Sequence, residues 1–140
     1  MARAAELTPP GEGCDTHGTH TLSTAIGHRF GVAKEAEAVV IQGLSCVADA
    51  QDSSIVKALE YAVDDARART PYKPAVVVLS LGGTKDYALN EAVKLTTQHH
   101  INVVVAAGNS HVDSCTASPS DVVAAATVAA VDDTLQVVRV

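Results

Sequence analysis

The sequence has few of the side chains on which several classes of protein depend. Aromatic residues make up only 3% of its 140 residues, with no tryptophan and one phenylalanine. The core must therefore be built from alanine, valine, leucine and isoleucine. Basic residues are also scarce: the formal net charge is −6, and the ten lysines and arginines form no cluster. Because nucleic-acid binding relies on basic contacts to phosphate, nucleic acid is excluded as a partner.

Long apolar runs are absent as well. The longest, roughly 122–131, is about half of the ~20 residues that a membrane-spanning helix needs. We therefore predict no membrane partner. The start of the chain, Met1–Glu6, lacks the apolar core of a signal peptide. The hydrophobic fraction of 47% is still sufficient for one folded domain or part of one.

Cysteine is limited to Cys14, Cys46 and Cys115, an odd number that cannot all pair within the chain. Either all three are reduced thiols, or one has a partner outside these 140 residues. A zinc site at Cys14, His17 and His20 is an alternative, since sulfur and imidazole suit zinc. A structural zinc site needs four ligands, and no second ligand pair follows at a fitting distance. We therefore predict no metal and no other cofactor.

Apolar segments of two periods alternate along the chain and predict an α/β fold. Because strands that alternate with helices form βαβ units, we expect a mostly parallel sheet with helices on both faces. Continuous apolar runs predict strands buried on both faces. Residues 1–13, which contain Pro9-Pro10-Gly11, are predicted to be a loop or truncated end, and 14–140 a partial domain. The expected strands are 36–41, 75–79, 103–106 and 122–130, and the expected helices are 17–27, 55–69 and 87–100.

Two glycine-containing motifs come directly after two of the expected strands. Ser80-Leu81-Gly82-Gly83 follows the run at 75–79, and Ala106-Ala107-Gly108-Asn109 closes the run at 103–106. Ligand sites of open α/β sheets lie at the carboxyl ends of the strands. The two motifs are therefore predicted to lie together at one site.

A third motif, Asp15-Thr16-His17-Gly18-Thr19-His20, opens the first expected helix. Imidazole is the side chain best suited to take and return a proton near neutral pH. Each motif alone has a plain explanation: a loop histidine, a strand-to-helix turn, or an asparagine in a turn. Their order and spacing are more specific, since Asn109 follows His17 by 92 residues.

The three motifs in this order resemble the subtilisin-like serine proteases, most closely the proteinase K branch. In subtilisins about 91 residues separate the catalytic histidine from the oxyanion asparagine. The resemblance implies a three-layer α/β fold and peptide-bond hydrolysis by acyl transfer, with His17 as general base and Asn109 as oxyanion donor. It also implies that Ser80–Gly83 binds an extended peptide substrate and that Ala106–Gly108 form a wall of the S1 pocket.

The catalytic aspartate and serine of that family have no counterpart here. In subtilisins they lie about 30 residues before and about 160 residues after the histidine. Only 16 residues precede His17 and 123 follow it, so both would fall outside the chain. No serine has the Gly-Thr-Ser-Met-Ala context of the nucleophile. We expect the central part of a catalytic domain that is inactive alone; the alternative is a non-catalytic pseudoprotease or peptide-binding module.

The resemblance implies three further properties. The location would be secreted or extracellular. Cys115 lies where many proteinase K-like proteins have a cysteine that pairs with a downstream one. Calcium is bound in the family, but by carboxylates that would lie beyond residue 140, so this segment does not support calcium. A partial α/β domain also leaves sheet edges uncovered, and we expect the isolated chain to self-associate through them.

Overall fold

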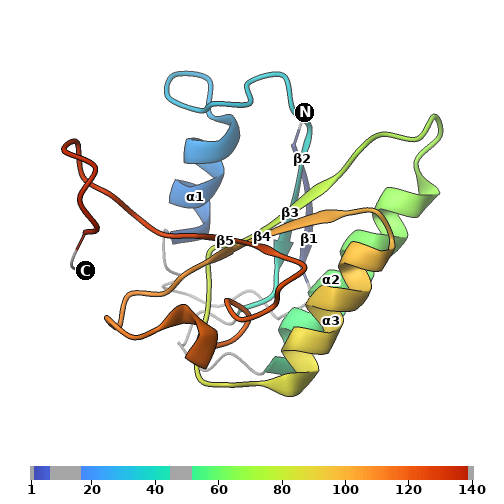
Figure 1. Ribbon diagram of the computed structural model, residues 1–140. Helices are drawn as coiled ribbons and strands as arrows, with labels where there is room; N and C mark the ends of the chain where they lie inside the picture. Colours follow the sequence, from blue (N-terminus) through green and yellow to red (C-terminus); the bar gives the residue numbers. More distant parts are fainter. Residues whose placement is uncertain (1, 7–16, 45–51, 139–140) are drawn as a thin grey trace. The chain divides into compact units, whose positions relative to one another are not determined.

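The computed structural model describes residues 2–6, 17–44 and 52–138. Strands and helices alternate along these residues, as expected for an α/β fold (Figure 1). The chain divides into two compact units, residues 1–58 and 59–140, each described here by itself. The elements are β1 (Ala2–Glu6), α1 (His17–Ile26), β2 (Ala38–Gln42), α2 (Asp52–Ala68), β3 (Val76–Leu79), α3 (Tyr87–Gln98), β4 (Asn102–Ala106), the 3₁₀ helix η1 (Ser114–Thr116) and β5 (Ala126–Val128).

The first unit contains a parallel pair of strands. β1 pairs with β2 in a register that runs from Ala2 opposite Ala38 to Glu6 opposite Gln42. Parallel strands need a long crossover, and α1 lies in it. The expectation of a loop over 1–13 is wrong for 2–6, while 7–13 lie outside the described residues. The sequence Ala-Arg-Ala-Ala-Glu has no β-branched residue, so only pairing with β2 reveals this strand.

The expected helix at 17–27 is confirmed as α1, and a glycine ends it. The Gly27 N–H donates to the Ser23 carbonyl at 2.9 Å. A Cβ atom on Gly27 would lie only 2.3 Å from that carbonyl oxygen. No larger residue fits this backbone without a shift, so glycine is required where the chain leaves the helix.

The second unit contains a parallel sheet of order β3–β4–β5. In its register Leu79 lies opposite Val105, and Val105 lies opposite Thr127. α3 provides the crossover from β3 to β4, which completes a βαβ unit. The predicted parallel α/β architecture is thus confirmed in this unit.

Helices cover one face of this sheet. The α3 residues Leu89, Val93 and Thr96 are buried, at spacings of four and three. Val63 and Ala66, from the second half of α2, form a core cluster with Ile101, against which Ala75 and Val77 pack. Figure 1 shows α2 and α3 on the same side of β3 and β4.

The opposite face of β3 is exposed, which corrects the expectation of a strand buried on both faces. Val76 and Val78 are 59% and 58% exposed, whereas Leu79 is buried. A run of valines indicates a strand but not how many of its faces are covered. The strand expected over 122–130 is also shorter, only β5, because 122–125 form turns in which Ala125 donates to the Val122 carbonyl at 2.9 Å.

Candidate functional site at the ends of β3 and β4

The two strand-end motifs predicted to meet do lie side by side. β3 and β4 are neighbours, with Leu79 opposite Val105. Ser80–Gly83 follow β3, and Ala106 is the last residue of β4. The carboxyl ends of parallel strands share one edge of a sheet. Both motifs therefore lie at that edge.

The motif after β3 is anchored at its last residue. The Gly83 N–H donates to the Ser118 carbonyl at 2.9 Å, and the Ser118 N–H donates to the Gly83 carbonyl at 3.2 Å. Among the residues that the structure describes, no hydrogen bond outside the sheet ladder uses the main chain of Leu81 or Gly82. A Cβ atom on Gly82 would lie 3.3 Å from the Ser118 oxygen, whereas one on Gly83 would meet nothing within 4 Å.

The motif after β4 turns sharply at a glycine. The Ala107 N–H donates to the Val128 carbonyl at 2.9 Å, which ties this end to β5. Gly108 has φ +95°, in the region that favours glycine. Asn109 follows with an exposed side chain, and its amide makes no hydrogen bond to any residue within the described ranges. Its N–H donors are thus available to a ligand.

The chain beyond Asn109 forms η1, capped by Asp113. The Asp113 carboxylate accepts from the Cys115 N–H at 2.9 Å. The pKa of Asp113 is lowered mainly by this backbone hydrogen bond and secondly by a hydrogen bond from the Cys115 side chain. The same carboxylate raises the pKa of the Cys115 thiol, by the hydrogen bond first and by its charge second. Cys115 is an exposed free thiol, so the structure holds it unpaired.

A polar network, which the sequence did not reveal, joins the segment before α3 to the chain that follows β4. The Lys85 ammonium donates to the Asp121 carboxylate and to the Cys115 carbonyl, the latter at 3.2 Å. Asn90 Nδ2 donates to the other Asp121 oxygen at 2.8 Å. Burial raises the pKa of Asp121, but the bonds from Lys85 and Asn90 outweigh it, so the net pKa is lowered. We call this network the Lys85–Asp121 clasp.

A second link joins the same segments through Ser118. Its side chain accepts from the Asp86 N–H at 2.8 Å and donates to the Asp86 carbonyl at 3.2 Å. Asp86 in turn caps α3, where its carboxylate accepts from the Ala88 and Leu89 N–H groups at 2.7 and 3.0 Å. Ser118 is only 1% exposed. Its hydroxyl is therefore a buried connector between the loop and the helix.

His17 is the first residue of α1 and is exposed. It belongs to the first unit, whereas the strand-end motifs belong to the second. The structure thus brings together Ser80–Gly83 and Ala106–Asn109, and describes His17 separately from them. Asp15 and Thr16 lie outside the described residues.

The zinc alternative needs Cys14, which is likewise outside the described residues. Within 2–6, 17–44 and 52–138, no group of three or more histidine, cysteine or carboxylate side chains could hold a metal ion. None of the helices within those ranges is both long and apolar enough to cross a membrane.

Comparison with known proteins points to one family. The model of the subtilase family matches residues 4–138. Subtilisin-like protease 7 of Arthroderma gypseum is 39% identical over 117 residues, which cover 84% of this chain and 29% of that protein. Subtilisin-like protease 3 of Arthroderma benhamiae is 39% identical over 119 residues, 84% of this chain and 30% of that protein.

A comparison with solved structures points to the same family. The crystal structure of a cold adapted subtilisin-like serine proteinase matches with a TM-score of 0.74 at 29% identity, over 91% of this chain and 47% of that one. The chain thus spans 29% and 30% of the two curated relatives. It corresponds to part of their length.

Proposed function

Because the chain belongs to the subtilase family, we propose that it is part of a serine endopeptidase domain that hydrolyses peptide bonds by acyl transfer. The observation that carries the proposal is the meeting of Ser80–Gly83 and Ala106–Asn109 at one sheet edge. The family match over 4–138 supports it.

In this proposal the side-chain amide of Asn109 donates a hydrogen bond to the oxyanion of the tetrahedral intermediate. The carbonyl oxygen of the scissile bond gains negative charge when the nucleophile attacks it. An amide held at a fixed position stabilises that charge more than it stabilises the uncharged ground state. The exposed Asn109 amide, preceded by the tight turn at Gly108, supports this role.

His17 would act as general base and then as general acid. It would take the proton of the serine nucleophile and deliver it to the leaving amine. Its exposed position at the first residue of α1 supports access to a substrate. The family match includes this segment.

The peptide substrate would pair with the main chain after β3. Leu81 and Gly82 supply N–H and C=O groups, and Gly83 anchors the segment through Ser118. An extended peptide can add to such a strand end by main-chain hydrogen bonds, which do not depend on the side chains of the peptide. Ala106–Gly108 would form one wall of the pocket for the side chain at the cleaved bond.

We further propose that the 140-residue chain alone does not hydrolyse peptides, because no serine in it has the sequence context of the nucleophile. A secreted location is proposed from the family resemblance. If the intact protein is not catalytic, the same strand-end motifs would form a peptide-binding module. The main chain of Leu81 and Gly82, which makes no hydrogen bond outside the sheet ladder among the described residues, supports this second function. It predicts binding without turnover.

Complementation tests the proposal. The chain is co-expressed with the segments of Subtilisin-like protease 7 that it does not match, and hydrolysis of a chromogenic peptide anilide is measured. We expect activity that depends on His17 and Asn109. Loss of Asn109 should reduce kcat by about 10²–10³, and loss of His17 by about 10⁶. Peptide binding by the chain without any restored hydrolysis would favour the binding module instead.

A further inference from the structure

Two segments of the second unit are tied together by bonds from main chain and side chains. The first segment, 83–86, follows the peptide-binding motif and leads into α3. The second, 113–121, follows Asn109 and contains η1. Gly83 pairs with Ser118 through two main-chain bonds, and the Ser118 hydroxyl bonds to Asp86. The segments that leave the two strand ends are therefore fixed to each other.

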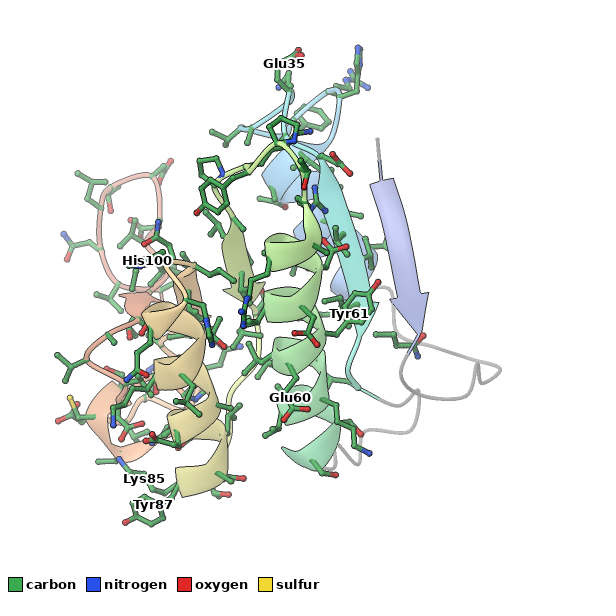
Figure 2. The ribbon with its side chains drawn as sticks, turned by 90° about the vertical axis from the view of Figure 1, so that its right-hand side faces the viewer. Glu35, Glu60, Tyr61, Lys85, Tyr87 and His100 are labelled. Carbon is green, nitrogen blue, oxygen red and sulfur yellow. The ribbon has the colours of Figure 1, made fainter. Side chains whose placement is uncertain are left out.

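Within the Lys85–Asp121 clasp, Lys85 and Asp121 form the only ion pair between these two segments among the described residues. Its side chains are 35% and 15% exposed, whereas those of the surface pair Lys94–Glu91 are 54% and 56% exposed. Partly buried charges are screened less by water, so the clasp should hold its geometry better than the surface pair. Figure 2 shows Lys85 at the start of α3, beside Tyr87.

The clasp also reaches η1. The Lys85 ammonium bonds to the Cys115 carbonyl as well as to Asp121, and Asn90 of α3 bonds to the second oxygen of Asp121. One ammonium thus connects the loop before α3, η1 and the turn after it. Its removal would leave the Asp121 charge partly buried with Asn90 as its remaining side-chain partner.

We propose that Lys85 and Asp121 are positioning residues for peptide binding, which hold the main chain of Leu81 and Gly82 in register for an extended peptide. The inference rests on the proposed function of the strand-end motifs in peptide binding. Main-chain pairing requires several N–H and C=O groups to be in place at once. A segment that is already ordered loses less conformational entropy when the peptide binds.

The order of the loop is a quantity that can be measured without a ligand. The Gly83 and Asp86 N–H groups both bond to Ser118, and their hydrogen exchange reports how often the loop opens. If the clasp holds the loop, its loss should raise exchange at these two amides. Amides in the middle of β4 should not change, because they belong to the sheet.

The experiment uses the full chain and four variants. Lys85→Met and Asp121→Asn remove one charge each, Lys85→Arg keeps the charge, and Lys94→Met breaks the exposed pair on α3 as the matched control. Amide exchange is followed by NMR. Affinity is measured by fluorescence anisotropy with a labelled Ser-Ala-Val-Ala-Val-Ala-Ser peptide, and a version with alternate amides N-methylated shows whether binding uses the main chain.

We expect Lys85→Met and Asp121→Asn to raise exchange at Gly83 and Asp86 by about tenfold or more, which corresponds to about 1.4 kcal/mol of opening free energy, and to weaken peptide binding several-fold. Lys85→Arg should keep both the amide exchange and the peptide affinity close to the wild-type values, and Lys94→Met should change neither quantity. Unchanged exchange in the charge-removing variants would overturn the inference even if the wild-type chain binds peptide.

Two other outcomes are informative. Faster exchange with unchanged affinity would also overturn the inference, because the clasp would then be structural only. A wild-type chain that binds neither peptide would overturn the proposed peptide-binding site, and the positioning role with it. The exchange data would still show whether the clasp orders the loop. The two failures are therefore distinguishable.

Discussion

At the scale of single residues, the strand-end site depends on one backbone conformation. Gly108 has φ +95°, which an alanine adopts only with strain. No atom within 4 Å would meet its added Cβ, so the backbone alone determines the cost. We expect Gly108→Ala to reduce the free energy of unfolding by about 1–2 kcal/mol, measured by urea denaturation.

Gly83→Ala is the matched control for that measurement. An added Cβ at Gly83 would likewise meet nothing within 4 Å, and its φ lies outside the strained region. It should therefore leave the unfolding free energy within about 0.5 kcal/mol of the wild type. Equal effects of the two substitutions would contradict the assignment of strain to position 108.

The reactivity of Cys115 is a second property of a single residue. The Asp113 carboxylate raises the pKa of this thiol, so less thiolate is present at a given pH. Since the thiolate is the nucleophile, alkylation by iodoacetamide at pH 8 should be slower than for an unperturbed thiol and should rise with pH. Asp113→Asn lowers the pKa and should speed the reaction, as followed by mass spectrometry of the Cys115 peptide.

Asp113→Asn is informative because asparagine also caps helices, so η1 should persist in the variant. Identical pH profiles for the two proteins would show that Asp113 does not control the thiol. At this scale the sequence identified the strand-end residues because motif order and spacing are readable along the chain. It did not identify Lys85 with Asp121, because partners 36 residues apart have no local signature.

At the scale of elements, α3 was predicted closely, since its apolar residues recur with the helical period. Expected over 87–100, it spans Tyr87–Gln98. The position of β3 was predicted correctly, but the exposure of one of its faces was not. Whether a face of a strand is buried depends on which elements pack against it. β1 was missed, because its residues carry little strand preference, and the strand is revealed only by its pairing with β2.

The start of α3 provides a prediction about an element. The Asp86 carboxylate accepts from two N–H groups of the first turn, which would otherwise have no partner in the helix. Asp86→Ala should reduce the free energy of unfolding by about 1 kcal/mol. Asp86→Asn retains a capping oxygen and should cost less; equal losses in thermal or urea unfolding would show that the cap is not the cause.

At the scale of the whole molecule, the valine face of β3 argues for self-association. Val76 and Val78 are 59% and 58% exposed on a strand whose other face is covered by helices. Adjacent apolar side chains exposed on a sheet favour association with another surface. In light scattering we expect a species larger than the 14.4 kDa monomer, whose size increases with concentration.

Threonine retains strand preference while it reduces apolar surface, so Val76→Thr with Val78→Thr should shift the chain toward monomer. Val123→Thr is the control, since Val123 is fully exposed but lies in a turn outside the sheet. A concentration-independent monomer in the wild type would contradict the prediction. An equal shift in the control would assign association to general surface hydrophobicity, whereas a shift in the double variant alone assigns it to β3.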